Sequence, residues 1–188
     1  MISAPNLTLV LGGTRSGKSL YAEKIASSHG PNVLYIATAE IWPGEGSMED
    51  RVRLHRARRP ATWETLECPR GIAEALARTP ELLASRDAAM LDCMTLLMTN
   101  LMTESMKNAE AERAMEHELD ALLAAIAASS VPWVVVSAET GLGLVSPDPA
   151  TRLFCDVLGL ANQKMAAAAG AVVLTVAGLP VALKGVVS

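Results

Sequence analysis

Residues 7–19 read LTLVLGGTRSGKS, an apolar run followed directly by a glycine-rich segment. The second part matches G-x-x-x-x-G-K-S, the pattern of a phosphate-binding loop (P-loop), whose backbone N–H groups surround the phosphates of a nucleotide. The apolar run is typical of a strand, and the residues after the loop have a helical pattern, so a helix N-terminus would face the phosphates. We therefore predict a nucleoside triphosphate site formed by Gly12, Gly13, Thr14, Arg15, Ser16, Gly17, Lys18 and Ser19.

Three side chains are expected to carry the chemistry of this site. Lys18 should reach the β- and γ-phosphates, and Ser19 should bind Mg²⁺. Asp92 follows the apolar run 88–91, where a parallel sheet would place a carboxylate that supports the Mg²⁺, known as the Walker-B position. The alternative for Asp92 is an N-cap of the helix that follows.

Short apolar runs alternate along the chain with helical patterns, which favours an α/β fold with a mainly parallel sheet flanked by helices. With the P-loop, this pattern predicts a P-loop NTPase of the RecA-like type. Strands are predicted at residues 7–11, 33–37, 88–91, 131–137 and 171–177, with a further edge strand at 62–66. Helices are predicted at residues 18–28, 48–58, 69–77, 95–106, 109–127 and 150–168. We expect residues 1–188 to form a single domain.

The composition limits the class of protein. Hydrophobic residues make up 51% and charged residues 19% of the chain, which excludes a disordered tail and a coiled coil. A net charge of −4 and an aromatic content of 3% argue against nucleic acid as a partner. No apolar stretch approaches the roughly 18 residues that a membrane span needs. Because Cys68, Cys93 and Cys155 lack disulfide and zinc-site spacing, we predict a cytoplasmic protein without a metal site built from the protein alone.

Residues 51–60 read RVRLHRARRP and form a dense basic segment. On a helix, Arg51, His55, Arg58 and Arg59 share a face through i, i+3 and i+4 spacing. Positive charges this close repel one another, and a bound triphosphate would relieve the repulsion. The same charges disfavour a protonated His55, which leaves a neutral imidazole nitrogen available as a nucleophile. Two alternatives are a solvated basic helix and an arginine lid without a nucleophile.

Further motifs follow the P-loop in order. They are YIATA at 35–39, the segment from Arg51 through His55 to Pro60, WETLE at 63–67, LDCMT at 91–95, TNL at 99–101, VVVSAE at 134–139, NQ at 162–163 and AGLP at 177–180. Together with the P-loop, they resemble the bifunctional adenosylcobinamide kinase/adenosylcobinamide-phosphate guanylyltransferase family of cobalamin biosynthesis. The similarity spans nearly the whole chain.

The resemblance implies two reactions. A nucleoside triphosphate, either ATP or GTP, phosphorylates the aminopropanol hydroxyl of the corrinoid adenosylcobinamide. GTP then guanylylates His55 with release of pyrophosphate, and the GMP passes to the new phosphate to give adenosylcobinamide-GDP. The resemblance also implies Mg²⁺, a homotrimer, and His55 and Lys18 as catalytic residues. Nucleotide contacts beyond the P-loop are implied at Ala37, Thr38, Ala39, Arg56, Ala57, Arg58, Arg59, Glu67 and Asp92.

The chain departs from the family pattern in two places. Residues 45–48 read EGSM where the family usually has Asp-x-Glu-Met, so Ser47 replaces the glutamate. Residues 138–141 read AETG where the family has Asn-Glu-Val-Gly, so Ala138 and Thr140 are the changed positions. These differences concern the acceptor side and the kinase reaction, and they leave the P-loop and His55 unchanged. Two other functions remain open: a P-loop kinase of a small metabolite with an arginine lid, and a RecA-like oligomeric ATPase.

Overall fold

Seven strands form one sheet in the computed structural model of the protein, which describes residues 2–40, 53, 56–102 and 108–185. The strands are β1 (Ala4–Gly12), β2 (Val33–Ala37), β3 (Glu64–Glu67), β4 (Ala88–Asp92), β5 (Trp133–Ala138), β6 (Ala169–Val176) and β7 (Leu179–Lys184). Their order in the sheet is β3-β2-β4-β5-β1-β6-β7. All neighbouring pairs are parallel except β6 and β7, so the carboxyl ends of six strands lie at one edge.

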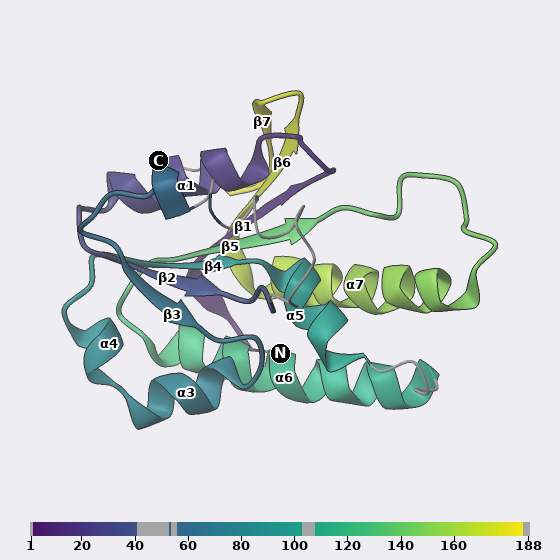
Figure 1. Cartoon of the computed structure of the whole chain (residues 1–188), viewed down its shortest axis with the longest axis horizontal. Helices are drawn as coiled ribbons and strands as arrows, with labels where there is room; N and C mark the ends of the chain where they lie inside the picture. Colours follow the sequence, from purple (N-terminus) through teal and green to yellow (C-terminus); the bar gives the residue numbers. More distant parts are fainter. Residues whose placement is uncertain (1, 41–52, 54–55, 103–107, 186–188) are drawn as a thin grey trace.

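Helices cover both faces of the sheet (Figure 1). They are α1 (Lys18–Ser28), α3 (Ile72–Arg78), α4 (Glu81–Ala84), α5 (Met94–Leu101), α6 (Asn108–Ala128) and α7 (Pro149–Ala168). On one face, Ala22, Ile25 and Ala26 of α1 join a core cluster with side chains of the sheet. On the other face, α3, α5, α6 and α7 contribute to a larger cluster. Because β2 and β4 are buried on both faces, their sequences are almost continuously apolar.

The predicted class and most predicted elements are confirmed. The five predicted inner strands and the helices at 18–28, 109–127 and 150–168 agree with the structure to within three residues at each end. The strand predicted at 62–66 is β3, and it lies at the sheet edge as expected. No described helix has both the length and the apolar character that crossing a membrane requires. The single-domain assignment of residues 1–188 stays a prediction.

Three predicted helices differ from the structure or are only partly described. The helix predicted at 69–77 begins at Ile72, because Gly71 before it has a left-handed backbone with φ 63°. The helix predicted at 95–106 ends at Leu101, since Met102 is extended, and residues 103–107 lie outside the described part. Of the helix predicted at 48–58, residues 53 and 56–58 are helical, and the others lie outside the described residues.

Strand β7 and the short helix α4 were not predicted. β7 turns back along β6 through Ala177 and Gly178, which both have positive φ, 52° and 81°. A two-residue hairpin turn requires this conformation, and Ala177 is a poor residue for it, so the local sequence hides the turn. Pro180 also argues against a strand, although an edge strand tolerates proline.

The end of β1 packs closely against β6, and this contact positions the P-loop. The Thr175 hydroxyl donates to the carbonyl oxygen of Leu11 at 2.9 Å and lies 3.0 Å from the Ser16 hydroxyl. A Cβ at position 12 would come within 2.3 Å of Thr175 Oγ1 and within 2.8 Å of the Thr175 carbonyl oxygen. Glycine is therefore required at position 12 because the neighbouring strand leaves no room for a side chain.

Gly12→Ala should lower the free energy of unfolding by about 1–3 kcal/mol, because the new methyl group overpacks the contact with Thr175. The measurement is urea denaturation. Gly13→Ala is the matched control, since a Cβ at position 13 meets no atom within 4 Å and should cost at most about 0.5 kcal/mol. Equal losses in the two variants would contradict the packing argument.

Candidate nucleotide-binding and catalytic site

The P-loop connects β1 to α1 through a tightly turned backbone. Arg15 and Gly17 have positive φ of 57° and 92°. The Ser16 N–H donates to the carbonyl oxygen of Gly13 at 3.2 Å, and the Gly178 N–H of the β6–β7 turn donates to the Ser16 carbonyl oxygen at 2.8 Å. Gly17 is the N-cap of α1 and offers no side-chain acceptor to the first N–H groups of the helix. Such a helix start is suited to an anion.

Lys18 and Ser19 lie in the first turn of α1, as the motif predicts. The Lys18 ammonium donates to the carbonyl oxygen of Gly13 at 3.2 Å, so the side chain folds back over the loop. A phosphate oxygen would be a stronger partner for the ammonium than this neutral carbonyl, because hydrogen bonds between charged groups are stronger. Around them, Gly13, Thr14 and Arg15 are exposed to solvent.

Asp92 ends β4 at the same edge of the sheet. Its carboxylate oxygen Oδ2 accepts a hydrogen bond of 2.8 Å from the hydroxyl of Tyr35 on β2. Burial, reinforced by the charge of Asp92, raises the pKa of Tyr35 far above its usual range, so the phenol keeps its proton and acts as the donor. The capping alternative for Asp92 is wrong, because Cys93 is the N-cap residue of α5.

Cys93 reports on the charges around the site. Burial, reinforced by the negative charge of Asp92, raises the pKa of its thiol to about 11, and the positive charge of Lys18 acts in the opposite direction. The sheet places Lys18 and Asp92 at the same edge, because β1, which leads into the P-loop, and β4, which ends in Asp92, both pair with β5 in parallel. At neutral pH the thiol is protonated, so Cys93 is not an activated nucleophile.

The arginines of the basic segment contact side chains of α1 and β3. Arg56 pairs with Glu67 of β3 at 2.5 Å, and Arg58 pairs with Glu23 of α1 at 2.6 Å. Arg59 donates to the Thr65 hydroxyl at 2.9 Å. Arg58 of the predicted basic face therefore already has a carboxylate partner within the chain, while Arg51 and His55 of that face lie outside the described residues.

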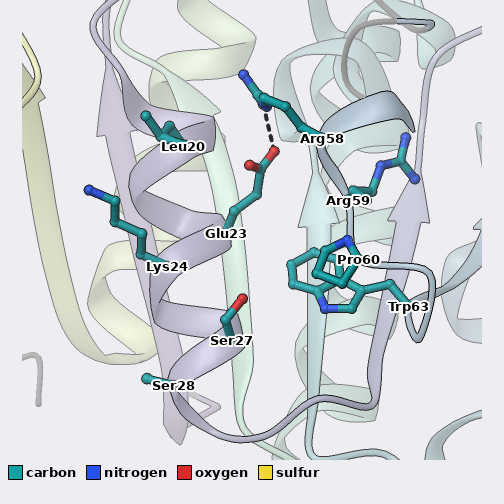
Figure 2. Close-up of a pocket in the computed structure, with 9 residues that line it drawn as sticks. All are labelled: Leu20, Glu23, Lys24, Ser27, Ser28, Arg58, Arg59, Pro60 and Trp63. Carbon is teal, nitrogen blue, oxygen red and sulfur yellow. Dashed lines mark hydrogen bonds and ion pairs between the residues drawn. The ribbon is translucent and has the colours of Figure 1, made fainter.

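A shallow groove of about 460 Å³ lies between α1 and the chain from Arg58 to Trp63. Figure 2 shows Arg58 pointing across this groove to Glu23, with Leu20 and Lys24 on the same helix. The ion pair closes the end of the groove that contains Leu20. Ala57 is exposed, and His55 lies outside the described residues, so its place relative to this groove stays a prediction.

Residues 37–39 follow the sheet edge, as predicted, but Thr38 is fully buried. Its hydroxyl donates to the Cys93 carbonyl oxygen and accepts from the Cys93 N–H, both at 2.8 Å. This pair of bonds joins the ends of β2 and β4. Ala37 is also buried, its carbonyl oxygen accepts from the Cys68 N–H at 2.8 Å, and Ala39 is half-buried.

Three polar side chains that stabilise this sheet edge, those of Asn100, Thr95 and Asn162, have no role predicted from the sequence. Asn100 donates to the carbonyl oxygens of Thr38 and Pro69 at 2.8 and 3.0 Å. The Thr95 hydroxyl accepts from the Ala138 N–H at 2.8 Å, and Asn162 donates to the Ala138 carbonyl oxygen at 3.0 Å. Each of the three lies in a sequence motif quoted above, LDCMT, TNL or NQ, and that was the signal available for them. Ala138 takes part through its backbone alone, so these bonds do not require the asparagine usual in the family.

Comparison with known proteins places this geometry in a family. Residues 8–183 match the family model described as cobinamide kinase / cobinamide phosphate guanyltransferase. The bifunctional adenosylcobalamin biosynthesis protein CobP of Pseudomonas aeruginosa is 42% identical over 177 residues, which cover 94% of this chain and 96% of that protein. The bifunctional adenosylcobalamin biosynthesis proteins CobU of Salmonella typhimurium and Escherichia coli are 39% and 34% identical over 186 residues, which cover 95% of this chain and 99% of each relative. With its P-loop and Asp92 at one sheet edge, the chain belongs to the cobinamide kinase / cobinamide phosphate guanyltransferase family.

Proposed function

We propose that this chain phosphorylates adenosylcobinamide with ATP or GTP and then transfers GMP from GTP to adenosylcobinamide phosphate through His55. The observation that carries the proposal is the sheet topology, which brings the P-loop with Lys18 and the end of β4 with Asp92 to one edge, with the arginine segment paired to α1 and β3, in a chain of this family. The first reaction needs a triphosphate cradle with a cation. The second also needs a nucleophile, and the sequence supplies His55.

The residues present fit a Mg²⁺ ion. The hydroxyl of Ser19 and the carboxylate of Asp92 offer the oxygen ligands that this hard cation prefers. When bound, Mg²⁺ would neutralise charge on the phosphate oxygens. Lys18 would exchange the Gly13 carbonyl for the β- and γ-phosphates, and the N–H groups of the P-loop would hold the triphosphate in place while the corrinoid hydroxyl attacks the γ-phosphorus.

In the second reaction a ring nitrogen of His55 forms a bond to the α-phosphorus of GTP, and pyrophosphate leaves. The phosphate of adenosylcobinamide phosphate then attacks the same phosphorus, the nitrogen–phosphorus bond breaks, and adenosylcobinamide-GDP is released. Arg56, Arg58 and Arg59 would neutralise charge on the entering and leaving groups. The exchange of partners is cheap for Arg56, because its pair with Glu67 is about half exposed and such pairs contribute only about 0–1 kcal/mol.

The assembly and the compartment are also proposals. We propose a homotrimer, since β7 presents Leu179, Val181 and Leu183 to solvent at 69%, 49% and 58% exposure. An apolar strand at a sheet edge tends to be covered by another chain, because its backbone groups are unpaired on one side. We further propose that the enzyme works in the cytoplasm, where reducing conditions keep the free Cys68, Cys93 and Cys155 as thiols.

With GTP labelled at the α-phosphate and Mg²⁺, the protein should form a GMP adduct on His55 that is labile in acid and stable in alkali. Acid labilises the bond because protonation of the ring nitrogen makes it a good leaving group. His55→Ala should abolish the adduct and retain phosphorylation of adenosylcobinamide. A wild-type protein that binds GTP and stays unlabelled would favour the plain small-metabolite kinase with an arginine lid.

Asp92→Asn should raise the Mg²⁺ concentration for half-maximal turnover by about ten- to a hundredfold, because an amide oxygen is a poorer ligand for this cation than a carboxylate. Nucleotide binding measured in EDTA should stay within about twofold of wild type. The measurement is a Mg²⁺ titration of corrinoid phosphorylation. An unchanged titration curve would exclude the metal role of Asp92.

Light scattering should give wild-type protein a mass three times the 19.8 kDa of one chain. Leu183→Glu should shift the mass toward that of a single chain, because a buried carboxylate on β7 would be costly to desolvate. Leu144→Glu changes a fully exposed leucine in the loop after β5 and should leave the mass unchanged. A wild-type mass of one chain would rule out the trimer.

A further inference from the structure

Tyr35 lies between two groups that the proposed reactions use. It is on β2, and only 3% of its surface is exposed. Its hydroxyl donates to Asp92 Oδ2 at 2.8 Å. The guanidinium carbon of Arg59 lies 3.6 Å from the centre of the Tyr35 ring. One side chain therefore contacts both the carboxylate assigned to Mg²⁺ and an arginine assigned to the nucleotide.

The fold explains why this side chain reaches both groups. Ala37 is opposite Asp92 in the β2–β4 ladder. Tyr35 is two residues before Ala37 on the same strand, so the side chains of Tyr35 and Ala37 lie on the same face of the sheet. From that position the length of the phenol carries its hydroxyl to the carboxylate at the strand end. Trp63 packs in the same cluster, with its ring centre 6.3 Å from that of Tyr35.

The contact with Arg59 ties the basic segment to the sheet. The guanidinium of Arg59 stacks on the ring of Tyr35 on β2 and donates a hydrogen bond to the Thr65 hydroxyl on β3. These two contacts fix its position relative to both strands. A guanidinium on an aromatic face is attracted by the ring and keeps its N–H groups free to point sideways. Any movement of the ring would therefore move Arg59 and the Asp92 carboxylate together.

We propose that Tyr35 is a positioning residue that orients the Asp92 carboxylate through its hydroxyl and seats Arg59 through its ring, which couples Mg²⁺ binding to the arginine segment. The inference rests on the proposed role of Asp92 in binding Mg²⁺. It assigns two separable tasks to one side chain, so substitutions that remove the hydroxyl alone or the whole ring should behave differently.

The test of the hydroxyl is an equilibrium binding experiment with α,β-methylene GTP, in which a CH2 group replaces the oxygen between the α- and β-phosphorus atoms, so that His55 cannot displace pyrophosphate. Calorimetry gives its Kd in EDTA and across a Mg²⁺ titration. Tyr35→Phe should leave the Kd in EDTA within about twofold of wild type and raise the half-saturating Mg²⁺ concentration about tenfold, which is typical for the loss of a partner that orients a metal ligand. Tyr21→Phe removes the other tyrosine hydroxyl of the chain and should change neither value.

Two results would overturn this part of the proposal. One is a wild-type Mg²⁺ titration in Tyr35→Phe, and the other is an equal loss of affinity with and without Mg²⁺, which a merely structural role would produce. Asp92→Asn in the same experiment separates the inference from its premise. A defect in Asp92→Asn without a defect in Tyr35→Phe would sink only the inference, whereas normal Mg²⁺ binding in Asp92→Asn would remove the premise.

The test of the ring compares Tyr35→Leu with Tyr35→Phe. In Tyr35→Leu, the Kd measured in EDTA should be about threefold higher than in Tyr35→Phe, because Arg59 loses its aromatic contact. Tyr35→Leu should also form the GMP adduct more slowly than Tyr35→Phe. Arg59→Lys in the otherwise unchanged protein keeps the charge without the planar contact and should reproduce the added loss. Equal Kd values in EDTA for Tyr35→Leu, Tyr35→Phe and Arg59→Lys would contradict the proposal that the Tyr35 ring positions Arg59.

Discussion

The hydroxyl of Thr38 makes the contact on which the candidate site depends. It bonds both the N–H and the carbonyl oxygen of Cys93, each at 2.8 Å, in a place that water does not reach. Buried backbone groups need hydrogen-bond partners inside the protein, and this one side chain supplies them for both backbone groups of Cys93, directly after β4. Asn100 binds the Thr38 carbonyl oxygen from the next helix. The relative position of Tyr35 on β2 and Asp92 on β4 follows from this connection.

The arginine segment is held by carboxylates of the same chain. Glu23 and Glu67 bind Arg58 and Arg56 in the way that phosphate oxygens would. Exposure of both partners keeps the Arg56–Glu67 pair weak, whereas Glu23 in the other pair is only 12% exposed. In the proposed complex, a triphosphate would meet arginines that these carboxylates already hold in place. The pairs also lower the repulsion among the arginines.

The sequence was sufficient for the class, the P-loop and most elements because each has a local cause. The apolar runs predict buried parallel strands, and the glycines and Lys18 predict the loop from spacing alone. The Asp92 position followed from its place after a strand. In contrast, Thr38, Asn100 and Tyr35 form their contacts with residues 31 to 62 positions away, which no local pattern encodes. The β6–β7 hairpin was missed because its turn uses Ala177, and the pairing of the arginines with Glu23 and Glu67 is also a tertiary property.

The hydrogen bond from the Gly178 N–H to the Ser16 carbonyl oxygen has a thermodynamic consequence. It connects the tip of the hairpin that contains β7 to the backbone that would cradle phosphate, and Gly17 leaves only 3.1 Å between a Cβ at its position and Gly178. Linkage between two binding sites is reciprocal. If association of another chain with β7 changes the affinity of the P-loop for an anion, then a bound anion changes the affinity of β7 for that chain by the same factor. If the chain assembles through β7 as proposed and the two sites are coupled, dilution of the protein and removal of nucleotide would perturb a single equilibrium.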